Sequence, residues 1–183
     1  MALLAVGCAA QPTAGTPPAT AFNATDTAWI QLMIPMDERA QLLTELAPSR
    51  KGDPALAELA ARTALRLRDN LVRLRDLLEL SAIPDTRPHE GHDMPGMVSL
   101  DTLEKAGTAT GQAFDRILTD ALRAHLTQSR MLCASERTQG HADNAREVAA
   151  AIAQSTAEQV SWLDTLRPAG PAPSGGATPA TVP

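Results

Sequence analysis

A segment rich in histidine and methionine lies in the long interruption between two helix-forming halves of the chain. It holds two of the four histidines and two of the six methionines of the sequence, at His89, His92, Met94 and Met97. Imidazole and thioether groups are the ligands that proteins use for soft, late transition metals, Cu(I) above all. The residue types and their close spacing therefore indicate a copper-binding loop.

The same segment also permits an interpretation without a metal. Pro95 and Gly96 are typical turn residues, and methionine side chains often fill gaps at the edge of a core. In this alternative the segment is an ordinary loop that leads into the next helix. Its spacing is less diagnostic than the cysteine and histidine spacing of a zinc finger, so both interpretations stay open.

The N-terminus is typical of an exported lipoprotein. Residues 1–8 form a short apolar run that ends in Gly7 and Cys8, and such a run resembles the signal end of bacterial lipoproteins, where the cysteine is acylated. Two features depart from the usual pattern, because Ala5 stands where leucine is common and no Lys or Arg precedes the run. We expect lipidation at Cys8, with an apolar N-terminus and a chance cysteine as the alternative.

Composition divides the rest of the chain into one domain between two segments that cannot form a core. Residues 9–22 and 167–183 are rich in Ala, Thr, Pro and Gly, which predicts a flexible linker and a disordered tail. No apolar run approaches 18 residues, so the lipid is expected to hold the protein at the extracytoplasmic face of the membrane, in the cell envelope. The net charge of −5 gives no support to nucleic-acid binding.

Residues 23–166 are predicted to be helical throughout. Tyr is absent, Phe and Trp occur twice each, and apolar residues recur at gaps of three and four. The spacing predicts long helices over about 23–46, 54–80, 108–137 and 143–166, and a short helix from Ser99 to about Gly107, with Met131 and Cys133 in the core. A weak similarity between residues 26–34 and 114–122 indicates a duplicated helical hairpin. We expect an all-α, up-down four-helix bundle.

The chain resembles the bacterial DUF305 family, a domain of unknown function. The lipoprotein-like start, the duplicated hairpin and the joint at residues 92–97 carry the resemblance, together with residues 33–35 and 114–115. It covers residues 22–166. The resemblance implies a ferritin-like fold, export from the cytoplasm and, for several members, binding of copper or silver.

The resemblance also implies a set of metal ligands inside the bundle, and most of these are replaced here. The family has a His-His pair on the first helix of each hairpin and a Gln-x-x-Glu pattern on the second. Only His125 keeps its type, and it remains a candidate ligand. The substituted positions are Met36, Asp37, Ala124, Leu67, Asn70, Thr156 and Gln159.

Two functions follow from these observations. The first is weak binding or buffering of Cu(I) by an anchored extracytoplasmic protein, through the His/Met loop. The second is a structural or interaction module that has lost its metal and serves a membrane or envelope protein partner. An enzyme is not expected, because no Glu is followed by His three residues later and the chain has no nucleophile elbow or phosphate-binding glycine loop.

Overall fold

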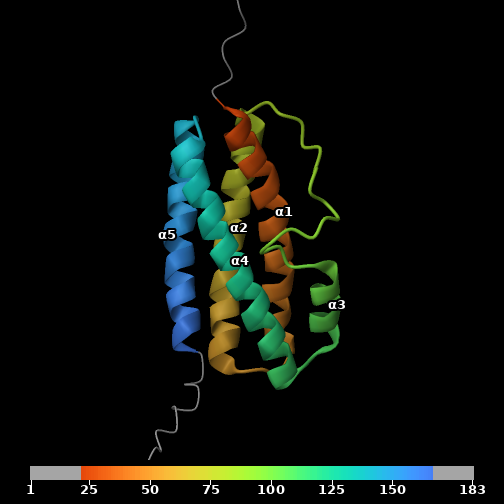
Figure 1. Cartoon of the computed structure of the whole chain (residues 1–183). Helices are drawn as coiled ribbons and strands as arrows, with labels where there is room; N and C mark the ends of the chain where they lie inside the picture. Colours follow the sequence, from red (N-terminus) through yellow and green to blue (C-terminus); the bar gives the residue numbers. More distant parts are fainter. Residues whose placement is uncertain (1–21, 167–183) are drawn as a thin grey trace, which may run out of the picture.

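The computed structural model describes residues 22–166, and this part of the chain is all-helical, as the sequence predicts. Four long helices pack side by side, and each is antiparallel to its neighbours in space (Figure 1). They do not alternate in chain order, because the second (Pro54–Leu80) and the third (Gly111–Gln139) run in the same direction, which differs from the predicted up-down order. The predictions for residues 1–21, including lipidation at Cys8, and for the tail from 167 to 183 lie outside the described residues. The elements are α1 (Ala24–Leu46), the 3-10 turn η1 (Ala47–Ser49), α2 (Pro54–Leu80), α3 (Leu100–Thr108), α4 (Gly111–Gln139) and α5 (Asp143–Thr165).

The helix starts follow from local capping chemistry. The Asn23 side chain accepts a hydrogen bond from the backbone N–H of Asp26, and the Asp26 carboxylate accepts one from the N–H of Asn23, which forms a capping box at α1. At α2, the Asp53 side chain accepts hydrogen bonds from the first turn, and Pro54 occupies the position where a missing N–H costs nothing. Both starts agree with the sequence prediction.

The junction between α3 and α4 differs from the prediction. A helix was expected from about residue 108, but Ala109 and Thr110 are extended and α4 begins at Gly111. Gly111 has a φ of +55°, and its N–H donates to the carbonyl of Arg50 at 2.7 Å. This bond ties the start of α4 to the α1–α2 connection, which apolar periodicity does not reveal.

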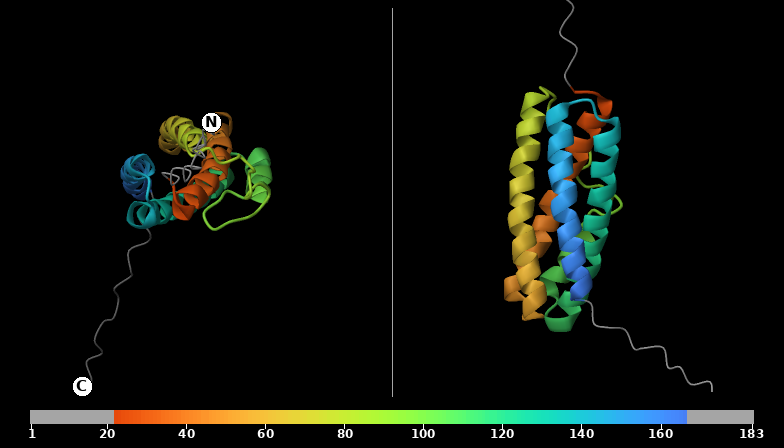
Figure 2. Two further views of the ribbon diagram at one scale, coloured as in Figure 1. Left: turned by 90° about the horizontal axis from the view of Figure 1, so that it is seen from above. Right: turned by 90° about the vertical axis from the view of Figure 1, so that its left-hand side faces the viewer.

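The helices pack as two hairpins. α1 pairs with α2, α4 pairs with α5, and the hairpins meet where α1 contacts α4 and α2 contacts α5 (Figure 2). α3 lies against α1 and α4, and the loop of residues 81–99 passes outside α1 (Figure 1). The recurrence at gaps of three and four that predicts the helix over residues 54–80 is confirmed by the buried side chains of α2: Leu56, Leu59, Ala60, Thr63, Leu67, Leu71, Leu74 and Leu78.

The inner face of α4 corrects one prediction. Met131 was expected in the core, but it is 63% exposed. Its neighbours Ser129 and Cys133 are buried instead. A residue two positions away lies about 200° around the helix, so Met131 must face solvent when those two face inward. Burial of Cys133 agrees with the prediction.

Two aspartates play equivalent roles in the two hairpins. Asp26, near the start of α1, accepts backbone hydrogen bonds from His141 at 2.9 Å and Ala142 at 3.1 Å, just before α5. Asp115, near the start of α4, accepts one from the N–H of Asp53 at 2.9 Å, just before α2. Each hairpin thus caps the second helix of the other, which supports the duplication that the sequence predicts.

Candidate functional site

The His/Met loop is fastened to α1 by two arginines. Arg39 is only 8% exposed, and its guanidinium donates to the carbonyls of His92 at 3.2 Å and Val98 at 3.4 Å. Arg87, within the loop, pairs with Glu38 of α1 at 2.6 Å. Burial raises the pKa of Glu38, but its hydrogen bonds with arginine outweigh this effect and lower the pKa overall. The loop therefore has a defined position on the bundle.

The Met-Pro-Gly-Met part of the loop forms a tight turn against α4. The N–H of Met97 donates to the carbonyl of Met94 at 2.9 Å, and Gly96 adopts a φ of +75°. A Cβ at Gly96 would lie 2.2 Å from the Cβ of Gln128 on α4. Glycine is required here both by the backbone conformation and by the close approach of the two segments.

The two loop histidines lie next to each other. The ring centroids of His89 and His92 are 6.4 Å apart, with an interplanar angle of 66°, and the N–H of His92 donates to the carbonyl of His89 at 3.2 Å. His92 is exposed and His89 is half-buried. The loop thus brings two imidazoles together at the surface.

The two loop methionines separate from each other. Met94 is half-buried, whereas Met97 is 8% exposed. Met97 and Ala124 line a cavity of about 370 Å³ between α3 and α4. Met97 therefore contributes to the packing of the joint, and Met94 is the methionine with access to solvent.

A second group of predicted residues converges inside the bundle. The Nε2 atom of His125 lies 3.4 Å from the Oδ1 atom of Asp37, and both side chains are almost fully buried. The amide of Asn70 donates to the other carboxylate oxygen of Asp37 at 3.2 Å. Met36 is fully buried, and Gln159 is half-buried with its amide bonded to the carbonyl of Ser155. His125 and Asn70, two of the positions that the family resemblance singles out, thus both contact a third, Asp37.

Cys133 belongs to the surroundings of Asp37, which the sequence did not reveal. Its thiol is fully buried, and burial together with the nearby carboxylate of Asp37 raises its pKa to about 12. His125, Ser129 and Cys133 follow one another at intervals of four, so all three share the inner face of α4. This interval of four was the signal in the sequence that could have placed Cys133 on the same face as His125.

The loop and the interior group do not form one site. Within residues 22–166, no three His, Cys, Asp or Glu side chains gather in a way that could hold a metal ion. The carboxylate of Asp37 already contacts His125 and Asn70, so each of its oxygens has a neighbour that a metal ion would have to displace. The loop offers two imidazoles and one accessible thioether, a donor set that suits a soft ion of low coordination number. None of the helices in residues 22–166 is long and apolar enough to cross a membrane.

Comparisons with known proteins agree with this architecture. No curated protein matches the chain. A crystal structure of a DUF305 fragment from Deinococcus radiodurans is 14% identical, with a TM-score of 0.70, and the match covers 79% of this chain and 96% of that one. A DUF305 protein from Streptomyces coelicolor, whose name provisionally classes it as secreted, is 17% identical, with a TM-score of 0.69 and coverages of 78% and 91%.

At these identities the two structures establish a shared fold. The sequence profile of the domain of unknown function DUF305 matches residues 26–167, which is most of the chain. The prediction of family from the joint, the hairpin repeat and the first helix is confirmed. The chain belongs to the DUF305 family.

Proposed function

We propose that this protein is a non-enzymatic, lipid-anchored protein of the cell envelope that binds or buffers Cu(I) weakly through its His/Met loop. In this proposal the helices form a ferritin-like bundle at the extracytoplasmic face of the membrane. The secreted class given to the Streptomyces coelicolor protein supports that location. The observation that carries metal binding is the pair of imidazoles at His89 and His92, on a loop that Arg39 fixes to α1.

The separation of the two rings suits one shared ion. Two metal–nitrogen bonds of about 2 Å each, added to the radius of each ring, span roughly the 6.4 Å between the centroids. Met94 follows two residues later and is half-buried, so its thioether is the nearest soft third ligand in the loop sequence. Cu(I) accepts imidazole and thioether ligands together.

The proposed affinity is low for a structural reason. A metal-bound imidazole is usually oriented by a hydrogen bond from its second nitrogen, and losing that bond weakens binding 10- to 100-fold, as an order of magnitude. Neither loop imidazole ring has a hydrogen-bond partner among residues 22–166. A buffering role fits such a site better than tight storage.

The second candidate is a structural or interaction module for an envelope protein partner. It is favoured by the interior, where His125 and Asn70 both contact Asp37, at positions that the family resemblance assigns to ligands. In this alternative the His/Met loop only locks the two hairpins together.

A competition titration separates the two candidates. The full chain carrying Cys8→Ser, which removes the lipidation thiol, is titrated with Cu(I) against a chromogenic chelator. We expect one bound Cu(I), and at least tenfold weaker binding in His89→Ala/His92→Ala. The matched control is His141→Ala. His141 is exposed and follows the C-terminal end of α4, so this variant should bind Cu(I) as the parent does.

Equal binding of Cu(I) by the parent and the double variant would contradict the copper proposal and favour the structural or interaction module. The anchor is tested separately by fractionating cells that express the unmodified chain or Cys8→Ser. The unmodified chain should sediment with membranes and the variant should be released.

A further inference from the structure

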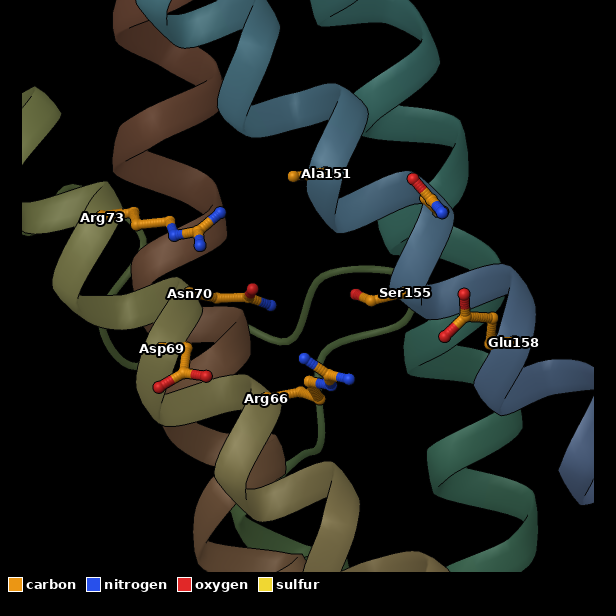
Figure 3. A pocket seen from close by; sticks show the side chains of 8 residues that line it. Arg66, Asp69, Asn70, Arg73, Ala151, Ser155 and Glu158 are labelled. Carbon is orange, nitrogen blue, oxygen red and sulfur yellow. The ribbon is translucent and has the colours of Figure 1, made fainter.

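A polar cleft lies between α2 and α5. These two helices are on the face of the bundle away from the His/Met loop (Figure 2). Its volume is about 250 Å³. Arg66, Asn70 and Arg73 line it from α2, and Ala151 and Ser155 line it from α5 (Figure 3). The small side chain of Ala151 leaves space opposite the longer side chains of α2.

The two arginines are placed for joint action. Arg66 and Arg73 are seven residues apart, which is two helical turns, and Asn70 lies between them on the same face. Neither arginine forms an ion pair, whereas seven other arginines in residues 22–166 do. In Figure 3 both guanidinium groups extend over the cleft towards α5.

Two acidic residues also line the cleft, but neither lies within ion-pair distance of the arginines. Asp69 and Glu158 form no ion pair with Arg66 or Arg73. In Figure 3 the Asp69 carboxylate lies over α2 and the Glu158 carboxylate lies over α5. The cleft is therefore lined by guanidinium, amide, hydroxyl and carboxylate groups, and its two guanidiniums are not engaged in ion pairs.

The floor of the cleft retains hydrogen-bonding capacity. One N–H of the Asn70 amide donates to Asp37 at 3.2 Å, which orients the amide and leaves its second N–H available. The hydroxyl of Ser155 donates its proton to the carbonyl of Ile152 at 3.1 Å, so the Asn70 amide is the neutral donor of the two.

We propose that this cleft binds a phosphoryl oxyanion between Arg66 and Arg73, either as free phosphate or as the headgroup of an anionic lipid. A planar guanidinium donates two parallel hydrogen bonds to such a group, and two guanidiniums on one helix face can bind it from both sides. The cleft is open to solvent, so binding is weak and decreases with added salt. This inference is independent of copper binding by the loop.

Nuclear magnetic resonance on the isotopically labelled full chain, carrying Cys8→Ser, provides the first test. Sodium phosphate is added at constant ionic strength, with sodium chloride as the reference salt. We expect saturable shifts for the Asn70 side-chain amide and for backbone amides of residues 66–73 and 151–155, with a dissociation constant of about 1 mM or above. Arg66→Gln/Arg73→Gln should weaken binding at least tenfold.

The chain offers a matched control on the other side of α5. Arg130 and Arg137 are also seven residues apart and also lack ion pairs, and they border a separate cavity between α4 and α5. Arg130→Gln/Arg137→Gln should leave phosphate binding unchanged. Ala151→Glu places a carboxylate opposite Arg73 and should block phosphate without unfolding the helix, because residue 151 is exposed.

Vesicle sedimentation distinguishes the two sources of the phosphoryl group. Arginine-dependent binding to phosphatidylglycerol vesicles, but not to phosphatidylcholine vesicles, would identify a lipid headgroup, and binding to free phosphate alone would identify the soluble anion. Either result supports the oxyanion site. The proposal is overturned if no saturable binding occurs with either probe, or if the two arginine pairs contribute equally.

Discussion

The carboxyl group of Glu136 on α4 lies against that of Asp26 at the start of α1, and both side chains are fully buried. Burial works to raise the pKa of Asp26, but hydrogen bonds from Asn23, Glu136, Ala142 and His141 outweigh it and lower the pKa. Glu136 has no comparable donors, so burial and then Asp26 raise its pKa to about 8. At neutral pH the Glu136 carboxyl is therefore protonated beside the ionised carboxylate of Asp26, where α1 meets α4.

This pair predicts a stability that decreases with pH. The pKa of an unfolded Glu is about 4.3, so between about pH 4.3 and about 8 the folded state binds more protons than the unfolded state. The unfolding free energy must then decrease as pH rises through that interval, and this contribution is lost above it. The charge of Arg146 on α5 opposes the rise in the pKa of Glu136. Cys133 is the other titratable group near Glu136 on α4.

Glu136→Gln should flatten that dependence. The glutamine amide donates to Asp26 without titrating, so the variant should lose less stability than the parent between pH 5 and pH 9. Urea unfolding at both pH values measures the difference, and the carboxyl groups away from this pair contribute equally to both proteins. Parallel pH profiles for parent and variant would show that Glu136 is ionised in the folded protein.

A second buried polar contact lies three turns further along the same seam. Asp26 and Asp37 are eleven residues apart on α1, and His125 and Glu136 are eleven apart on α4, so both contacts lie where α1 meets α4. His125→Leu removes one partner of Asp37 and should cost about 3 kcal/mol of unfolding free energy.

The Asp37→Leu/His125→Leu double variant should cost at least 1 kcal/mol less than the sum of the two single variants, because it leaves no unpaired partner. Urea unfolding of all four proteins gives this coupling energy. Additive effects would show that the two residues do not interact across the seam.

Arg39 is expected to control the order of the loop. Arg39→Ala removes hydrogen bonds to two loop carbonyls from a buried guanidinium and should lower the unfolding free energy by about 2 kcal/mol. Amide hydrogen exchange in residues 92–98 should accelerate. Arg75→Ala breaks an exposed ion pair with Glu38 and should cost less than about 1 kcal/mol without affecting the loop. Unchanged exchange in Arg39→Ala would contradict this role.

Two glycines of the loop form a matched pair for testing its contact with α4. Gly91 and Gly96 both have positive φ, but an added Cβ meets nothing at Gly91 and collides with Gln128 at Gly96. Gly91→Ala should cost about 1 kcal/mol, from backbone conformation alone. Gly96→Ala should cost at least about 1 kcal/mol more, as measured by urea unfolding. Equal costs would mean that the turn does not pack on α4.

Local chemistry determined much of the fold. Asn23 and Asp53 cap the helices that follow them, and the stripe of leucines on α2 leaves only one face to bury. These features depend on residues within a few positions of one another, so the sequence alone predicts them. The start of α4 was misplaced because it depends on a hydrogen bond from Gly111 to Arg50, sixty-one residues away in the chain.

The identity of the buried partners was decided by the tertiary structure. Helical periodicity assigns a residue to a face, but it does not say which residue lies opposite. His125 was singled out by type, yet its contact with Asp37, and the pairing of Glu136 with Asp26, depend on the register between two hairpins. The loop shows the same limit. Its four candidate ligands lie close together in the sequence, so the sequence does not say which of them are exposed.

Docking of the turn on α4 separates those four residues. It buries Met97 between α3 and α4 and leaves His92 at the surface beside His89. The sequence thus determined which side chains with metal-binding chemistry the joint contains. The tertiary structure decided which of these side chains solvent and ions can reach. With Gly96 packed against Gln128, Met97 is buried and His92 is exposed.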